Sequence, residues 1–511
     1  MLAKTFQGLE DTLAEELRLL GADNVEPGRR MVSFEGDLEM LYRANMCCRT
    51  ALRILKPLFS FEASDPDELY DRVKAQEWDK VLTPEKTFSI DVTVYSDEFP
   101  HSRYVTYRVK DAIVDYFQDR LGEGVRPGVR LQDADVMLNV HISGRRVSLS
   151  LDSSGESLHK RGYRVASTEA PINEVLAAGI ILRSGWRGDC PLVDPMCGSG
   201  TFLVEAALIG ANIMPGIYRR HFAFEQWPDF DRELFESIYN DDSAEREIPF
   251  KIYGADVDPR AIAIAERNIK SAGVGRFIEL ERKALVQWTE APDEGFPGIM
   301  VTNPPYGQRI RVEDMEGLYG LLGTKLKNVF KGYHAWIIGY RDDYFNKIGL
   351  APSVKLPTLN GSLECEFRKY QTFEGRMKEF RTEGGAVQSD EERKQMAEKG
   401  RFKKNREFKK RFDEAEENEE GDIRSFKFHR IDFDRFDKRD RRDDRRDDRR
   451  DRDGWNRDRR DDRRGSDWGG RNRDRDSWGR DDRFRQGRND RKQNKGGRDY
   501  DRKRNRYDND R

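Results

Sequence analysis

Residues 191–211 read PLVDPMCGSGTFLVEAALIGA, and this stretch decides the fold. The apolar run that ends at Val193 is typical of a buried strand, and the apolar run from Thr201 predicts a helix to about residue 212. Gly198, Ser199 and Gly200 lie between them. Glycine lets the backbone turn tightly and approach a ligand, and a helix N-terminus offers unpaired N–H groups. The pattern therefore predicts a strand, a ligand-binding turn and a helix, with a plain strand-to-helix turn as the alternative.

The same alternation continues along the chain. A helix over residues 172–183 precedes this stretch, and strands are predicted at 251–255, 277–281, 298–302 and 334–339, with helices at 259–272 and 318–330. Strands that alternate with helices of this length indicate a parallel, doubly wound α/β sheet. In such sheets ligands bind at the carboxyl ends of the strands. Residues 218–247 interrupt the rhythm and are predicted to be an insertion, and Asn360-Gly361 predicts a hairpin into a last strand.

Two smaller units precede this sheet. Leu9, Leu13 and Leu17 recur at helical spacing before a predicted strand, which makes residues 1–59 a small α/β domain. Residues 60–160 combine strands near 88–95, 136–142 and 146–151 with a helix at 107–121. We therefore predict four regions, which are 1–59, 60–160, 161–374 and a tail over 375–511.

The tail differs from the body in composition. Of the 511 residues 37% are charged and 36% hydrophobic, and the net charge is −2. Residues 437–511 hold 30 Lys and Arg against 21 Asp and Glu, and no Leu follows residue 374. Burial of so few aliphatic side chains cannot offset the conformational entropy that the chain loses when it becomes ordered. The Arg/Asp-rich tail is therefore predicted to be disordered. Its Arg, Gly and Trp content favours weak, salt-sensitive RNA binding, whereas a self-neutralising solvated segment is the alternative.

The cysteine and histidine patterns bear on whether the protein has disulfide bonds or a metal site. The five cysteines include no CxxC, and the six histidines show no HxxxH or HxH spacing, so neither a disulfide framework nor a metal site is expected. Acidic residues within the first 16 positions argue against a signal peptide, and no apolar run approaches 18 residues. A cytoplasmic location is expected.

A second motif, GADVDP, follows the strand at 251–255 and contains Asp256 and Asp258. An acid at the tip of the neighbouring strand is suited to accept hydrogen bonds from ribose hydroxyls. Asp258 stands before Pro259, which is also a strong start signal for a helix. We therefore favour ribose binding for Asp256 and helix capping for Asp258, while keeping Asp258 among the candidate cofactor residues.

A third motif, NPPY, follows the strand at 298–302 and comprises Asn303, Pro304, Pro305 and Tyr306. The prolines fix the backbone, so that the Asn303 side-chain oxygen and the Pro304 carbonyl are neighbouring acceptors. Such acceptors suit a planar exocyclic amine and would stabilise positive charge that develops on its nitrogen during attack on an electrophile. Tyr306 could stack on the base. A proline-rich turn is the alternative for this motif alone.

The three motifs fall at strand ends of one predicted sheet, and together the chain resembles class I S-adenosylmethionine-dependent methyltransferases that act on exocyclic amines. Residues 157–164 (SLHKRGYR) and 170–174 (APINE) further resemble bacterial THUMP-domain RNA methyltransferases. The resemblance is strongest to the methyltransferase L family of 23S rRNA guanine-N2 methyltransferases. It implies a Rossmann-like catalytic domain after ferredoxin-like and THUMP domains, with S-adenosylmethionine as the cofactor.

The resemblance also implies site residues. Catalysis would depend on Asn303, Pro304, Pro305 and Tyr306. The cofactor would be bound by Asp194, Pro195, Cys197, Gly198, Ser199, Gly200, Thr201, Asp256, Asp258 and Asn303. The segment Glu281-Arg282-Lys283-Ala284 offers no clear contact for the adenine amine. Cys197 is expected to be a small packing residue, because methyl transfer to an amine needs no covalent intermediate.

The substrate and the function remain open at this point. Lys160, Arg161 and Arg164, with Tyr163 between them, predict RNA contacts through charge and stacking, and a solvated linker is the alternative. The expected function is N2-methylation of a guanine in 23S rRNA or a large-subunit assembly intermediate. The alternatives are a tRNA guanine-N2 methyltransferase, an adenine-N6 methyltransferase, and a non-catalytic RNA-binding ribosome-assembly factor.

Overall fold

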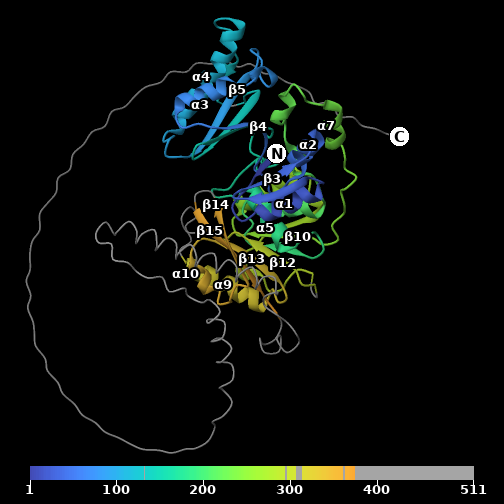
Figure 1. Ribbon diagram of the computed structural model, residues 1–511. Coiled ribbons are helices and arrows are strands. Elements are labelled where there is room, and N and C mark those ends of the chain that lie inside the picture. Colours follow the sequence, from blue (N-terminus) through green and yellow to red (C-terminus); the bar gives the residue numbers. More distant parts are fainter. Residues whose placement is uncertain (132, 294–295, 306–313, 361–362, 374–511) are drawn as a thin grey trace, which may run out of the picture. The chain divides into compact units, whose positions relative to one another are not determined.

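The computed structural model describes residues 1–131, 133–293, 296–305, 314–360 and 363–373 (Figure 1). These residues form two β-sheets with helices packed against them. The predicted tail at 375–511, the hairpin residue Gly361 and the candidate stacking residue Tyr306 lie outside the described residues. Among the described residues, none of the helices combines the length and the apolar character that crossing a membrane requires.

The first sheet has eight strands and runs through both N-terminal units. Its order is β2-β3-β1-β4-β8-β7-β5-β6. The strands are β1 Leu2–Lys4, β2 Asp23–Gly28, β3 Met31–Glu35, β4 Arg53–Glu62, β5 Thr87–Tyr95, β6 Gly128–Val129, β7 Val136–Ser143 and β8 Arg146–Asp152. Because β4 pairs with β8 in antiparallel fashion, the two units share one continuous sheet. The sequence predicted two separate α/β units and did not predict this pairing.

Four helices pack against this sheet. They are α1 Glu10–Leu19, α2 Leu38–Cys47, α3 Pro66–Lys74 and α4 Ser102–Leu121. Leu13 and Leu17 of α1 are buried in the same hydrophobic core as Val109 and Ile113 of α4. The Leu periodicity predicted from the sequence therefore marks the inward face of α1.

The second sheet has seven strands in the order β11-β10-β9-β12-β13-β15-β14. They are β9 Leu192–Asp194, β10 Ile252–Asp256, β11 Ile278–Arg282, β12 Ile299–Thr302, β13 His334–Gly339, β14 Val354–Asn360 and β15 Leu363–Gln371. The first five strands are parallel, and β15 joins β13 in antiparallel fashion. The predicted α/β class is confirmed.

Helices cover both faces of this sheet, as expected for a doubly wound fold. The helices are α5 Glu174–Ser184, α6 Thr201–Gly210, α8 Pro259–Ala272, α9 Met315–Asn328 and α10 Asp342–Lys347. Leu192 packs in one core with α5, α6 and α8, while the next residue, Val193, packs in another core with α9 and α10. Since successive strand residues point to opposite faces, each strand contributes to both cores.

The segment predicted to be an insertion contains a short 3-10 helix, Ala223–Gln226, and helix α7 Arg232–Tyr239, and another 3-10 helix, Pro215–Tyr218, ends where the segment begins. Phe222 and Phe224 from this segment are buried in the core beneath the first sheet. Their rings stack with centroids 5.1 Å apart. The insertion therefore packs against the N-terminal sheet, although it lies between α6 and β10 in the sequence.

Candidate active site

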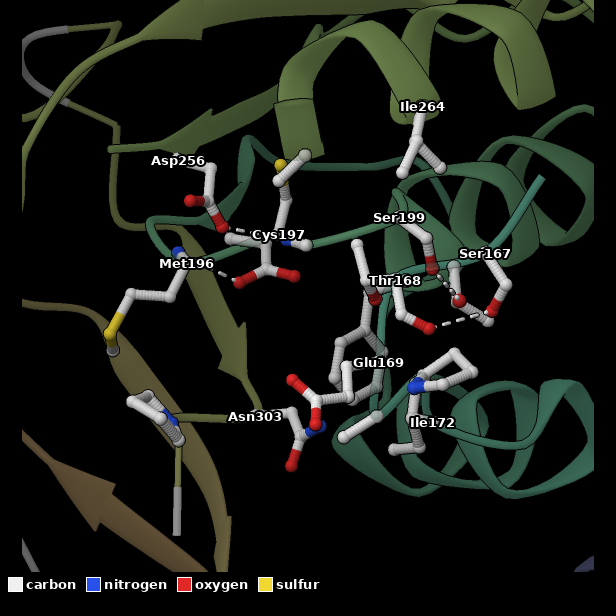
Figure 2. Close-up of a pocket in the computed structure, with 18 of the residues that line it drawn as sticks. Ser167, Thr168, Glu169, Ile172, Met196, Cys197, Ser199, Asp256, Ile264 and Asn303 are labelled. Atoms are coloured by element: carbon white, nitrogen blue, oxygen red, sulfur yellow. Dashed lines mark hydrogen bonds between the residues drawn. The ribbon is translucent and has the colours of Figure 1, made fainter. Parts of the chain in front are cut away.

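A large pocket lies at the carboxyl ends of β9, β10 and β12. Its volume is about 1250 Å³, and residues from all three sequence motifs line it. Figure 2 shows Asp256, Cys197, Ser199 and Asn303 arranged around this space. Ligand pockets for one small molecule are typically about 300–1000 Å³. The pocket is therefore large enough for a nucleoside cofactor together with a second planar group.

The glycine-rich turn connects β9 to α6 and needs glycine at two positions. Gly198 and Gly200 have φ angles of 54° and 78°, which are left-handed values that favour glycine. A Cβ atom on Gly200 would lie 3.1 Å from the Cβ of Ala265 in α8. A Cβ atom on Gly198 would have one neighbour within 4 Å among the described residues, Thr168 Oγ1 at 3.8 Å, which also lines the pocket. The turn thus packs tightly against α8 and leaves its other side open.

The N-terminus of α6 faces this open side. Gly200 is its N-cap residue, and among the described side chains none caps the helix. Its first N–H groups and its positive dipole end are therefore available to an anionic ligand group. Pro195, Cys197, Ser199 and Thr201 also line the pocket. Cys197 is buried, and burial raises the pKa of its thiol well above the ordinary value, which agrees with a packing role.

Asp194 ends β9 and is 1% exposed. Its Oδ1 accepts a hydrogen bond from the backbone N–H of Met196 at 3.2 Å, so it holds the start of the turn. Burial raises the pKa of this carboxyl to about 7. Asp194 therefore titrates in the neutral range in the folded protein.

Asp256 and Asp258 follow β10 and have different roles. Asp256 Oδ2 accepts a hydrogen bond from Gly198 N at 2.9 Å, and its Oδ1 accepts one from Asp258 N at 2.9 Å. This joins the second motif to the glycine-rich turn. Asp258 Oδ1 accepts from Arg260 N at 2.9 Å, so Asp258 caps α8, and the predicted capping is confirmed. Both carboxyl groups line the pocket.

Apolar side chains line the pocket beside Asp256. They are Val257, Ala261, Ile264, Ala284, Leu285 and Val286. Val257 and Val286 remain 64% and 60% exposed, although they are apolar. No acid follows β11 in the sequence at a position that clearly suits the adenine amine. The structure instead offers two apolar surfaces suited to a flat ring.

Asn303, Pro304 and Pro305 follow β12 and line the pocket. Pro304 is buried, and Asn303 and Pro305 are half-buried. Figure 2 shows the Asn303 side chain extending into the pocket. The structure therefore brings three of the four residues of the NPPY motif to the same cavity as the glycine-rich turn.

Arg164 contacts the glycine-rich turn, whereas the sequence predicted that it contacts RNA. Its guanidinium donates to Ser199 Oγ at 3.0 Å, to Thr201 Oγ1 at 2.9 Å and to the Glu174 carboxylate at 2.6 Å. It also donates to the Ile172 carbonyl. With these donors engaged inside the protein, Arg164 is a positioning residue for the turn.

Arg161 and Tyr163 are each 2% exposed, so this structure gives RNA no access to them. Arg161 pairs with the buried carboxylate of Glu205 in α6 at 3.4 Å and donates to the Arg49 carbonyl at 2.5 Å. The hydroxyl of Tyr163 donates to Glu205 at 2.9 Å. Both residues join the segment before α5 to α6. The side chain of Lys160 is 57% exposed and contacts Glu156. The RNA contact predicted for Lys160 therefore stays a prediction.

Sequence analysis missed Asn268, which is buried in α8. Its side chain accepts hydrogen bonds from Val165 N and Ala166 N and donates to Ser199 O at 3.0 Å. It therefore fixes the segment after Arg164 to the glycine-rich turn. The sequence shows only that a polar residue, Asn268, lies on the apolar side of a predicted helix. Its role cannot be predicted from this, because its hydrogen-bond partners lie far away in the sequence.

We expect Arg164→Lys to weaken binding of S-adenosylhomocysteine by about tenfold. Lysine keeps the charge but cannot span Ser199, Thr201 and Glu174 at once, and hydrogen bonds to charged groups are worth about 1.5–3 kcal/mol. Isothermal titration calorimetry measures the effect. Arg267→Lys, an exposed change on α8 at a residue that does not line the pocket, is the control. Equal affinity for both variants and the wild type would contradict the positioning role.

Asp194→Asn is expected to flatten the pH dependence of stability. The pKa of Asp194 is raised to about 7 from 3.8, so its stabilising contribution is full below 3.8 and is lost as pH rises through 7. Relative to the variant, the wild type should lose about 2–3 kcal/mol of unfolding free energy between pH 5 and pH 8. Urea denaturation at several pH values tests this, and parallel pH profiles would contradict it.

This geometry defines a class I methyltransferase fold preceded by ferredoxin-like and THUMP domains. Family models match in the same order. Residues 1–55 match the RlmL ferredoxin-like domain, 63–152 match the THUMP domain, and 161–369 match the RMKL-like methyltransferase domain. The chain belongs to this family of THUMP-containing, RMKL-like methyltransferases.

Individual relatives agree with this assignment. The chain is 39% identical over 381 residues to the ribosomal RNA large subunit methyltransferase K/L of Syntrophotalea carbinolica. The match covers 72% of this chain and 53% of that protein. It therefore spans about half of that relative. It is 37% identical to the putative RNA methyltransferase slr0064 of Synechocystis, covering 73% of this chain and 96% of that protein.

A solved structure is also similar. SMU.472, described as a putative methyltransferase complexed with SAH, is 31% identical to this chain with a TM-score of 0.64. The match covers 73% of this chain and 98% of SMU.472.

Proposed function

We propose that this protein transfers a methyl group from S-adenosylmethionine to the exocyclic N2 amine of a guanine in 23S rRNA. The observation that carries the proposal is the convergence of the glycine-rich turn, Asp256 and Asn303 on one pocket. If the motifs were only a helix-capping turn and a proline-rich loop, they would have no reason to line the same cavity.

The pocket fits the cofactor. The open side of Gly198 and the uncapped N-terminus of α6 suit the carboxylate of its methionine part. Asp256 suits the ribose hydroxyls, and Val257 with Val286 suits the adenine ring. When bound, S-adenosylmethionine supplies a methyl group on a positively charged sulfonium. SMU.472, whose similar fold binds the demethylated product SAH, supports this choice of cofactor.

Asn303 and Pro304 are proposed to hold the amine that is methylated. The Asn303 side-chain oxygen and the Pro304 carbonyl are acceptors, and they would bind the two N–H groups of an exocyclic amine. Their dipoles would stabilise the positive charge that develops on nitrogen as the new bond forms. The proton then becomes acidic, so no strong base is needed beforehand. Stacking of the base on Tyr306 stays a prediction.

RNA is the proposed substrate because of the THUMP match and the names of the relatives. A base inside a helix cannot reach a buried pocket, so the target guanine would be flipped out of its stack. Exposed Lys160 lies on the pocket rim and would contact the phosphate backbone there. A tRNA guanine-N2 methyltransferase is the second candidate, since the pocket does not distinguish the two RNAs.

An in vitro methylation assay tests the proposal. Purified full-length protein is incubated with S-adenosylmethionine carrying a deuterated methyl group and, separately, with 23S rRNA, 16S rRNA and tRNA from cells that lack the gene. We expect deuterated N2-methylguanosine in the 23S rRNA digest. Label in tRNA alone would support the second candidate, and label in no nucleoside would contradict both.

A further inference from the structure

Glu169 is an acidic residue of the pocket that the proposed cofactor and amine contacts do not use. Glu169 lies between Arg164 and helix α5 and lines the pocket. Figure 2 shows its carboxyl group and the Asn303 side chain directed toward each other. An acceptor-only group therefore faces the site where the amine would be held.

The other acids that line the pocket are already engaged. Asp194, Asp256 and Asp258 accept hydrogen bonds from backbone N–H groups, Glu174 pairs with Arg164, and Glu156 pairs with Lys160. Within the part of the chain that the structure describes, Glu169 takes part in no hydrogen bond and no ion pair, and it is exposed to the pocket. Its carboxylate oxygens are therefore available to a ligand.

The bases differ in what they offer to such a carboxylate. Guanine carries a ring N1–H donor directly beside its N2 amine, whereas adenine carries an N1 acceptor beside its N6 amine. Asn303 and Pro304 can hold either amine, so they cannot choose between the two bases. A carboxylate is an acceptor only, so it accepts the N1–H of guanine and repels the N1 lone pair of adenine.

We propose that Glu169 selects guanine by accepting its N1–H while Asn303 and Pro304 accept the neighbouring N2 amine. This inference rests on the proposed function. Together these acceptors match the adjacent donors along one edge of guanine. A site built to accept a substrate N–H discriminates strongly against an analogue without that donor, because the site's polar group is then left unpaired.

The test compares two RNAs whose target bases differ at N1 and at position 6, which carries a carbonyl oxygen in guanine and an amine in 2,6-diaminopurine. A short RNA carries either guanine or 2,6-diaminopurine at the target position. Both bases have a 2-amine, but N1 of 2,6-diaminopurine has no hydrogen and is an acceptor. The ratio of kcat/KM values for the two RNAs is measured for the wild type, Glu169→Gln, Glu169→Asp and the control Glu266→Gln, an exposed change on α8.

We expect the wild type to prefer the guanine RNA at least about 100-fold. Glu169→Gln should reduce this preference at least tenfold, because a glutamine amide can donate to the N1 acceptor of diaminopurine as well as accept. Glu169→Asp keeps a carboxylate and should keep most of the preference, and the control should match the wild type. The KM for S-adenosylmethionine should change less than about twofold in every variant, since Glu169 is assigned to the base.

Two results would overturn the inference alone. The first is an unchanged preference in Glu169→Gln while the wild type forms N2-methylguanine. The second is a raised KM for S-adenosylmethionine with an unchanged preference, which would make Glu169 a cofactor contact. If the wild type forms no N2-methylguanine, the proposed function fails and this inference fails with it.

Discussion

Asn303→Ala is expected to lower the single-turnover rate of methyl transfer by at least about 100-fold at saturating S-adenosylmethionine. Asn303 follows β12 and lines the pocket that also holds the glycine-rich turn. Removing its side-chain oxygen takes away one of two proposed acceptors for charge that develops on the amine, and removal of one such group typically costs 100- to 1000-fold. Rapid-quench kinetics with radiolabelled methyl groups measure this rate.

Saturating cofactor separates this effect from any loss of cofactor affinity, since Asn303 is also a candidate cofactor contact. Asn328→Ala, an exposed change at the end of α9, is the matched control and should leave the rate unchanged. A rate for Asn303→Ala within about threefold of the wild type would remove Asn303 from the proposed chemistry.

Arg161→Met is expected to destabilise the protein by about 3–5 kcal/mol. It would leave the carboxylate of Glu205, which is fully buried, without its cationic partner. Breaking a buried ion pair from one side typically costs this much, whereas replacing both partners with matched uncharged groups is often neutral. The double change Arg161→Met with Glu205→Gln should therefore recover most of the loss. Urea denaturation followed by tryptophan fluorescence measures each free energy of unfolding.

Lys160→Met is the control for this prediction, because Lys160 is the preceding residue and its side chain is exposed. We expect it to change the free energy of unfolding by less than about 0.5 kcal/mol. If Arg161→Met were no more destabilising than Lys160→Met, the buried pair would not support the junction between α6 and the segment before α5.

The fold of the second sheet could be predicted from the sequence because strands β9, β10 and β12 each end in a residue pattern with a physical meaning. Gly198 and Gly200 mark a left-handed turn, and Pro259 after Asp258 marks a helix start. The strand predicted at 334–339 coincides with β13. Convergence of three strand ends then follows from parallel topology, so the three motifs that meet at the pocket could be identified without coordinates.

The roles of the basic segment could not be predicted in the same way. Arg161, Tyr163 and Arg164 are adjacent in sequence, and local composition suggested an RNA-binding patch. Their partners, Glu205 and Ser199, lie 44 and 35 residues away. Burial depends on such distant partners, so a charge cluster in sequence does not reveal whether its side chains face solvent. Glu169 escaped notice for the same reason, since its significance depends on facing Asn303.

The N-terminal sheet shows a second limit of sequence patterns. Alternating residues predicted strands at 136–142 and 146–151, and both exist as β7 and β8. The pairing of β8 with β4 joins segments about 90 residues apart. Hydrophobic alternation shows which face of a strand is buried but not which strand lies beside it. The four predicted domain boundaries stay predictions.

Nucleoside mass spectrometry on RNA from cells with and without this gene tests the central claim most directly. Large-subunit rRNA, small-subunit rRNA and tRNA are separated, digested and compared, and the deletion strain is complemented with the wild type or with Asn303→Ala. We predict that N2-methylguanosine falls in large-subunit rRNA alone and returns with the wild type but not with the variant. An unchanged set of methylated nucleosides in all three RNA fractions would contradict the proposed activity.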